Sequence, residues 1–284
     1  MKTTLSAYIE LTKPRITLLV LVTAYLGYYL GLRSQGSHMA TVDSWLILFY
    51  LILGTWATSA GAAVLNQVIE RRHDAKMTRT KNRPLVIGRI GPMNALVFGM
   101  VLSFSGYVFL YYLINPLTAW ISAATVFLYI LIYTPSKRIT TWNTIIGSIP
   151  GALPPVGGWV AATGSLAPPA WILFGILFCW QMPHFLAIAI IYAADYEKGG
   201  FKMLPNTTDN VDEVSFQIIF FVPLYAFSTA ESITFLLTGQ ISIPIPSPSI
   251  KGIIGLSPTT NFRSTIFILS PCIKNLFFIK EKQL

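Results

Sequence analysis

Three side chains with oxygen atoms recur at intervals of four residues: Asn66, Glu70 and Asp74. On a helix, residues at i, i+4 and i+8 project within an arc of roughly 80°, so the three can converge on one ion. Carboxylate and amide oxygens without a thiolate suit a hard cation such as Mg²⁺, which usually keeps several waters and is shared with substrate phosphates. The spacing therefore predicts a Mg²⁺ site with these three residues as ligands.

Basic residues follow this segment directly: Arg79, Lys81 and Arg83 precede Pro84. The proline should end any helix and turn the basic loop back over the acidic face. A metal site beside such cations is what a diphosphate leaving group needs, because both stabilise the negative charge that develops on it. The simpler alternative is a solvated loop with ordinary positive charge. Three acceptors on one helical face favour the functional interpretation.

A second polar cluster ends a later apolar run, at His184 and Asp195. Eleven residues are three helical turns to within about 20°, so a single helix would place both on one side. His184 would lie in the bilayer, where polar groups usually face a bundle interior or cavity. It contacts either a substrate or a neighbouring helix. Asp195 is either a second metal ligand or an interfacial charge.

The run from residue 143 to 163 contains Pro150, Pro154 and Pro155 together with four glycines. Such a composition predicts a broken helix, which is tolerated at membrane depth only against protein or a cavity. We therefore expect an intramembrane pocket beside it. Small residues for tight helix packing explain the glycines equally well.

Composition identifies the elements that must position these residues. The chain has 284 residues, of which 54% are apolar and only 11% charged. A soluble fold cannot hide that much apolar surface, whereas about 20 apolar residues in a helix span a bilayer. We predict an all-α, polytopic transmembrane helix bundle at residues 1–238. Seven spans are expected, at residues 16–32, 45–67, 91–114, 117–134, 143–163, 170–194 and 214–237.

Basic residues indicate the orientation. The segments before the first span and after the second, fourth and sixth carry 14 of the 20 Lys and Arg, and all four segments fall on one side when spans alternate. The loops on the opposite side carry almost none. The amino terminus and the polar loops should therefore be cytoplasmic. The first run is too long for a signal peptide, and no Arg- and Ser-rich extension precedes it, so we expect a bacterial plasma (inner) membrane. Topology explains the net charge of +9, and no nucleic-acid partner is expected.

These motifs together resemble those of the UbiA-type intramembrane prenyltransferases, and within that family those of the haem O synthase branch. The shared segments lie between residues 6 and 220. They are Leu11–Thr17, Ala60–Gln67, Asp74–Leu85, Tyr133–Pro135, Asn143–Trp159, Trp180–Phe185, Asp195–Tyr196 and Met203–Pro205. The Asn-x₃-Glu-x₃-Asp spacing indicates the superfamily, and the Gly- and Pro-rich run with the Pro-His-Phe segment indicates the haem branch.

The resemblance implies transfer of farnesyl from farnesyl diphosphate to the 2-vinyl group of haem B, with Mg²⁺ as the metal. Asn66, Glu70, Asp74 and Asp195 would be the catalytic residues, and Arg79, Lys81 and Arg83 would bind diphosphate. We add His184, Lys137 and Arg138 as haem contacts, because imidazole can ligate iron and cations can pair with propionates. A haem A synthase or a terminal oxidase is the expected downstream partner. The lipid bilayer is expected to surround the protein.

The carboxyl-terminal part departs from the family, which has about nine spans. Prolines and charges interrupt every window after residue 241, so we expect residues 239–284 to be an atypical tail, out of frame or a degenerate remnant of the last two spans. A prenyltransferase acting on an aromatic quinone precursor is one alternative function, and a small-solute transporter is another. The transporter is disfavoured because the charges gather at one interface.

Overall fold

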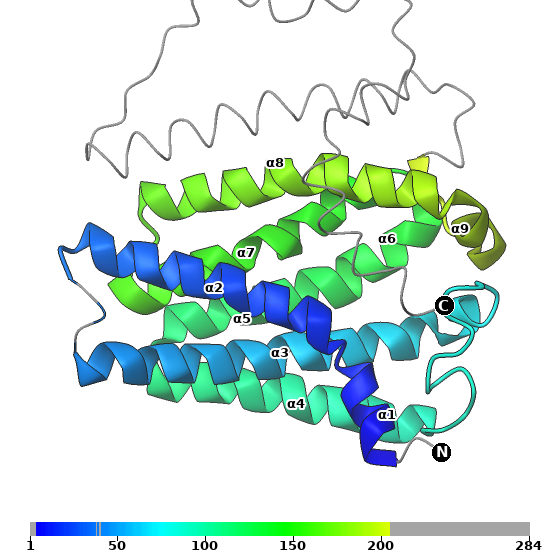
Figure 1. Cartoon of the computed structure of the whole chain (residues 1–284), viewed down its shortest axis with the longest axis horizontal. Coiled ribbons are helices and arrows are strands. Elements are labelled where there is room, and N and C mark those ends of the chain that lie inside the picture. Colours follow the sequence, from blue (N-terminus) through cyan, green and yellow to red (C-terminus); the bar gives the residue numbers. More distant parts are fainter. Residues whose placement is uncertain (1–3, 38, 40, 205–284) are drawn as a thin grey trace, which may run out of the picture. The chain divides into compact units, whose positions relative to one another are not determined.

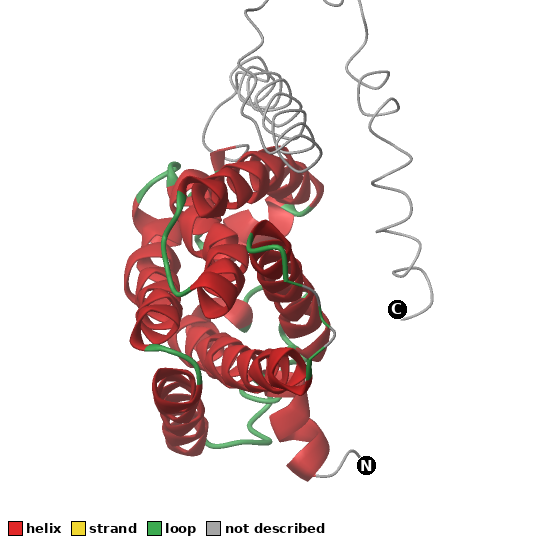
Figure 2. Cartoon of the chain, turned by 90° about the vertical axis from the view of Figure 1, so that its left-hand side faces the viewer, coloured by secondary structure: helices red, strands yellow, loops and turns green. Residues whose placement is uncertain are grey.

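The computed structural model describes residues 4–37, 39 and 41–204, and these residues form helices without any strand (Figures 1 and 2). The helical elements in chain order are α1 (Thr4–Leu11), α2 (Pro14–Ser34), α3 (Val42–Asp74), α4 (Pro92–Leu113), α5 (Pro116–Phe127), a π-helical segment (Leu128–Tyr133), α6 (Thr134–Ile139), α7 (Asn143–Thr163), α8 (Pro168–Ile191) and α9 (Ala193–Gly199). The all-α class predicted from composition is confirmed.

Six helices in the described part of the chain are long and apolar enough to cross a membrane. They are α2, α3, α4, the continuous α5–α6 unit, α7 and α8, and they confirm the first six predicted spans. The predicted span at 214–237 and the predicted tail at 239–284 lie outside the described residues. The fourth span is longer than predicted, because it runs from Pro116 to Ile139.

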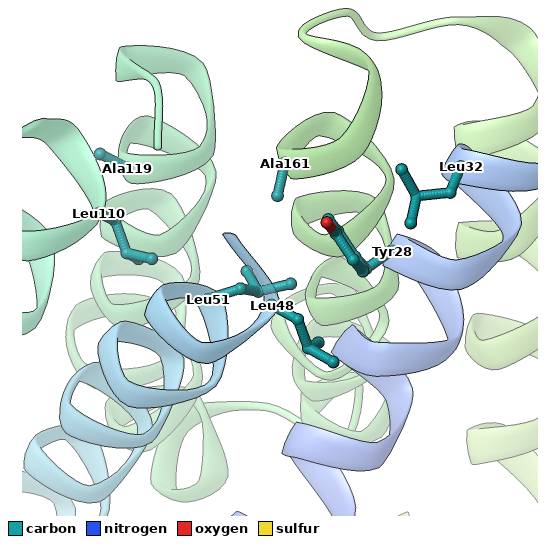
Figure 3. Packing of buried hydrophobic residues seen from close by; sticks show 7 residues of the cluster. All are labelled: Tyr28, Leu32, Leu48, Leu51, Leu110, Ala119 and Ala161. Carbon is teal, nitrogen blue, oxygen red and sulfur yellow. The ribbon is translucent and has the colours of Figure 1, made fainter. Parts of the chain in front are cut away.

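Helix α7 is the central element of the bundle, since it packs against α2, α5 and α8 and is the most buried of the six spans. Neighbours in sequence, α2 with α3, α3 with α4 and α4 with α5, pack against one another. At one end, the buried residues Tyr28, Leu48, Leu51 and Leu110 form an apolar cluster (Figure 3). The Tyr28 hydroxyl donates to the Ser44 carbonyl at 2.7 Å, which satisfies the polar end of this buried ring.

The prediction of a broken helix at residues 143–163 was wrong, because α7 is one continuous α-helix that contains all three prolines. This helix packs tightly on α2. A Cβ on Gly27 would lie 1.9 Å from the Pro155 carbonyl oxygen, and one on Gly158 would lie 2.0 Å from the Ala24 carbonyl oxygen. The glycines are therefore packing residues that let two backbones meet.

The fourth span changes its helical geometry shortly before its end. Residues Leu128–Tyr133 are π-helical, and the Thr134 N–H donates to the Tyr129 carbonyl five residues back. Pro135 follows and has no N–H to continue the ordinary pattern. Single π turns are frequent at functional sites, because the extra residue per turn redirects the side chains that follow. Here they are Thr134 and Lys137.

The sixth span also ends earlier than predicted. Helix α8 stops at Ile191, and a turn at Tyr192 separates it from the short helix α9. His184 and Asp195 therefore belong to different helices, and the prediction that they share one helical face was wrong. The end of α3, the loop after it, α1, α6 and α9 all lie at the same end of the bundle, on the right in Figure 1. That end carries the polar residues.

Candidate active site

The candidate site is built on the last turns of α3. This helix has 33 residues, or about 50 Å, so it is longer than a bilayer requires and brings its end beyond the hydrocarbon layer. Asn66, Glu70 and Asp74 lie on it at the predicted spacing, and their exposed fractions are 1%, 5% and 1%. Three buried polar side chains on one helix require partners, and neighbouring segments supply them.

Asn66 is held from two sides. Its Oδ1 accepts a hydrogen bond from Lys13 Nζ at 3.2 Å, and its Nδ2 donates to Thr134 Oγ1 at 3.1 Å. Lys13 stands between α1 and α2 with φ 48° and ψ 61°, a left-handed conformation that no other non-glycine residue in the described part of the chain adopts. Burial, reinforced by the positive charge of Arg83, lowers the pKa of Lys13 to about 7.

The two carboxylates are each paired with a cation. Lys137 Nζ donates to Glu70 Oε1 at 2.8 Å, and the Arg83 guanidinium donates to Asp74 Oδ2. Lys137 also lies 4.5 Å from the centre of the Tyr133 ring. Lys13, Arg83 and Lys137 come from three different segments, so the acidic face of α3 is surrounded by positive charge. The loop after Asp74 does turn back to the acidic face, since Arg83 reaches Asp74, but α3 ends at Asp74 and not at Pro84 as predicted.

The donor set fits Mg²⁺. Asp74 Oδ1 is buried and accepts no hydrogen bond from any described residue, so one carboxylate oxygen has the capacity for a further ligand. Among the described residues, no three His, Cys, Asp or Glu side chains are arranged so that they could hold a metal ion. The predicted set instead consists of two carboxylates and one amide. Mg²⁺ is commonly bound by one or two carboxylates together with substrate phosphates and water. Asn66, Glu70 and Asp74 would hold it.

The predicted diphosphate-binding residues have three different surroundings. Arg83 reaches Asp74, whereas Lys81 is exposed. The Arg79 guanidinium lies over the aromatic rings of Tyr192 and Tyr196, 5.0 Å and 5.9 Å from their centres. Arg79 is thus anchored to the start of α9 by cation–π contacts, and Arg83 is the member of the group that contacts the acidic face.

Asp195 contacts the backbone of this loop. Its Oδ1 accepts from the Thr78 N–H at 3.2 Å and its Oδ2 accepts from the Arg79 N–H at 2.9 Å. The hydrogen bond from the Arg79 N–H is the main reason that the pKa of Asp195 is lowered. Asp195 therefore fastens the basic loop to α9 in this structure, and neither of the two functions predicted for it, metal ligand or interfacial charge, describes that contact.

Arg138 and Lys137 diverge although they are neighbours in sequence. Arg138 NH1 lies 3.3 Å from His73 Nε2, and His73 Nδ1 lies 2.7 Å from the Gly199 carbonyl oxygen. A carbonyl only accepts and a guanidinium only donates, so His73 carries its proton on Nδ1. His73 thereby connects α3, α6 and α9. Sequence inspection had no reason to single it out among the charges around it.

His184 lies on α8, away from these contacts. Its ring stacks on Trp180, with centres 4.9 Å apart and an angle of 14° between the planes. Gln181, three residues before His184, packs against Gly151 of α7, where an added Cβ would lie 2.0 Å from its Oε1. The structure thus brings Asn66, Glu70, Asp74, Arg83, Lys137 and, through the loop, Asp195 together, and leaves His184 apart.

Two residues of the site were not predicted. Lys13 and Thr134 stand within segments that carry the family resemblance, Leu11–Thr17 and Tyr133–Pro135, but a lone lysine before an apolar run and a lone threonine within one have many ordinary roles. Each precedes a proline, which favours the extended region for the residue before it. Lys13 is left-handed and Thr134 is right-handed helical, so this local signal identifies neither of them.

Comparison with known proteins identifies the family of this chain. The UbiA prenyltransferase family matches residues 18–258 of the chain, which extends beyond the last shared segment, Met203–Pro205. A protein from Solibacter usitatus named protoheme IX farnesyltransferase is 45% identical over 216 residues, 75% of this chain and 74% of that protein. Another of that name, from Opitutus terrae, is 40% identical over 74% of this chain and 68% of its own length.

The fold is also known from experiment. The structure of a UbiA homologue from Archaeoglobus fulgidus, bound to GPP and Mg²⁺, superposes with a TM-score of 0.64 at 16% identity. The match covers 98% of this chain and 89% of that one. At this level of identity the likeness concerns the fold alone.

Proposed function

The chain belongs to the UbiA prenyltransferase family, and on that basis we propose that it transfers the farnesyl group of farnesyl diphosphate to the 2-vinyl group of haem B, forming haem O. The names of its relatives, which are 40–45% identical over about three quarters of the chain, support haem B as the acceptor. Membership of an enzyme family also removes the transporter hypothesis. The observation that carries the proposal is the buried acidic face of α3, enclosed by Lys13, Arg83 and Lys137.

The acidic face supports a Mg²⁺-dependent reaction. Asn66, Glu70 and Asp74 would hold the ion, and Asp74 Oδ1 has the capacity to coordinate it. When bound, Mg²⁺ neutralises charge on the diphosphate oxygens. The homologue from Archaeoglobus fulgidus binds GPP and Mg²⁺, which supports the same pairing here.

Breaking the bond between C1 of the farnesyl group and oxygen leaves an allylic cation and a diphosphate anion. Arg83, released from Asp74, and Lys137, next to Glu70, are placed to donate hydrogen bonds to the departing anion. The vinyl group of haem B then supplies the electron pair for the new carbon–carbon bond. Water adds to the cation that remains and releases one proton to solvent, which leaves the hydroxyl group. The surrounding helices keep water away until that bond has formed.

The acceptor is proposed to approach from the side of α8. The Trp180 and His184 rings form a stacked pair on that helix, and His184 makes no hydrogen bond to any described residue. An imidazole in such a position can ligate iron. Arg138 remains a candidate partner for a propionate, since its contact with the uncharged His73 ring does not neutralise the guanidinium.

The proposed location is a bacterial plasma membrane with the site on the cytoplasmic side. Among the described residues, the basic segments at 13–15, 71–89, 137–138 and 198–202 all lie at the end of the bundle that carries the site (Figure 1). An excess of Lys and Arg marks the cytoplasmic side. Haem O would pass from there to a haem A synthase or a terminal oxidase.

The test uses membranes that contain the full chain, supplied with haem B, farnesyl diphosphate and Mg²⁺, followed by mass analysis of the extracted haem. Asp74→Asn should abolish the farnesylated haem, and Asp43→Asn, an exposed position in the first turn of the same helix, should not. No product from correctly inserted wild-type chain would contradict the proposal. Prenylation of an aromatic quinone precursor in a parallel reaction would instead favour the alternative acceptor.

A further inference from the structure

We propose that Thr134 is a positioning residue, which fixes the side-chain amide of Asn66 so that its oxygen faces the metal site. The inference rests on the proposed function, because it concerns the ligand set assigned to Mg²⁺ above. Thr134 itself is fully buried and would touch neither the metal nor the substrate.

The hydroxyl of Thr134 has one hydrogen atom, and the structure determines where it goes. Thr134 Oγ1 lies 2.8 Å from the Tyr129 carbonyl oxygen, which can only accept. The hydrogen is therefore committed to Tyr129, and the side of Oγ1 that faces Asn66 presents a lone pair. The atom of Asn66 that lies 3.1 Å away must be a donor, so it is Nδ2.

This contact, together with the one from Lys13, determines which way the amide points. The two ends of an asparagine amide have nearly the same shape, and the group can turn over unless its neighbours distinguish them. With Nδ2 bound to Thr134, Oδ1 is the end of the amide that accepts from Lys13 Nζ. Glu70 and Asp74 follow Asn66 on the same helix at intervals of four residues, so we infer that this oxygen can share a metal ion with them. A metal ligand needs that orientation, since an amide nitrogen does not coordinate Mg²⁺.

The π-helical segment accounts for the position of the hydroxyl. Both the Thr134 N–H and its hydroxyl donate to Tyr129, five residues earlier, a separation that an ordinary α-helical turn does not bridge. The same geometry brings Lys137, one turn later, to Glu70. The departure from α-helical geometry thus serves two members of the acidic face at once.

Thr125 offers a matched control on the same span. Its hydroxyl donates to the Ile121 carbonyl at 2.8 Å, one turn back, and contacts no residue of the site. Thr134→Val and Thr125→Val remove the same atom and the same kind of hydrogen bond to the helix backbone, but only the first removes the acceptor of Asn66. Thr134→Ser keeps the hydroxyl.

The experiment measures binding of Mn²⁺, in the presence of inorganic diphosphate, by electron paramagnetic resonance on the purified full chain in lipid nanodiscs. We expect Thr134→Val to weaken Mn²⁺ binding by about tenfold or more, as loss of an outer-shell partner does, with Thr134→Ser and Thr125→Val close to wild type. Thermal unfolding of each variant in the same nanodiscs verifies that all are folded.

Equal binding by the Thr134→Val and Thr125→Val variants would overturn the inference and leave the proposed function intact. Absence of Mn²⁺ binding by the wild-type chain would overturn the proposed metal site, and this inference with it. A loss caused only by general destabilisation would affect both valine variants alike and would also count against a positioning role.

Discussion

The guanidinium of Arg83 donates to the carboxylate of Asp74, nine residues earlier in the chain. A cation assigned to the diphosphate and an anion assigned to the metal are therefore hydrogen-bonded to each other. Diphosphate and Mg²⁺ would have to bind together. Diphosphate would replace Asp74 as the anion beside Arg83, and Mg²⁺ would replace Arg83 as the cation beside Asp74. This relationship leads to the first of four predictions.

Replacing Arg83 by Gln should lower kcat for haem O formation by about 100-fold, because a charged donor to the leaving group is lost. The matched control is Arg89→Gln, an exposed position in the same loop, which should remain close to wild type. Steady-state kinetics with varied farnesyl diphosphate provide the measurement. Equal losses for the two variants would show that the loop contributes only its overall charge.

The pair Glu70–Lys137 should behave as a buried ion pair, since the exposed fractions of the two side chains are 6% and 12%. Lys137→Met leaves an unpaired carboxylate and should lower the free energy of unfolding by about 3–5 kcal/mol. Glu70→Gln combined with Lys137→Met has neither charge and should recover much of that loss without recovering activity. Unfolding in mixed micelles measures the stability of each variant. A double variant that is no more stable than Lys137→Met would contradict the interpretation of Glu70 and Lys137 as a buried ion pair.

Asp195 should hold the basic loop in a manner that depends on pH. Because the folded pKa is lowered, the ionised carboxylate contributes stability above the unfolded pKa of about 3.9, and this contribution is lost as pH falls through the folded value. Asp195→Asn should therefore speed tryptic cleavage after Arg79 several-fold at pH 7 to 8. Glu197→Gln, exposed on the same short helix, is the control.

The same variants can be compared across pH by hydrogen exchange of the Thr78 and Arg79 amides. After correction for the intrinsic exchange rate, the difference between wild type and Asp195→Asn should stay constant from pH 7 to about pH 5 and shrink below the unfolded pKa. A difference that persists at low pH would mean that the carboxylate charge is not what holds the loop.

Gly27 should not tolerate a side chain, because a Cβ there would collide with the backbone of Pro155. Gly27→Ala should destabilise the protein by about 3 kcal/mol, at the upper end of the cost of overpacking. Gly175, within α8, has no described atom within 4 Å of an added Cβ, and Gly175→Ala should be neutral or stabilise by up to about 1 kcal/mol. Unfolding of both variants in the same detergent provides the comparison.

Spans could be predicted from sequence because apolar run length decides whether a helix crosses a bilayer. Asn66, Glu70 and Asp74 could be found because four-residue spacing has a direct geometric meaning on a helix. The unbroken course of α7 through Pro150, Pro154 and Pro155 could not be predicted, because the close approach of α2 at Gly27 is a tertiary contact that the local sequence does not reveal. Thr134 could not either, because its partner lies 68 residues away on α3.

Arg79 and Arg83 show the same limit within one loop. Their sequence spacing suggests a common role, yet one lies over Tyr192 and Tyr196 and the other contacts Asp74. A short charged segment does not state which of its members turns inward. That is decided by the aromatic residues and the carboxylate that tertiary structure brings beside it.

The separation of Glu70 from Lys137 has a consequence for biosynthesis. Lys137 is 67 residues further along the chain, so the end of α3 is synthesised and inserted well before its cation exists. Until the fourth span follows, Glu70 can keep its charge only by remaining in water or at the lipid headgroups. The nascent chain therefore has to delay burial of that helix end, and the arrival of Lys137 is the step that allows the bundle to close around it.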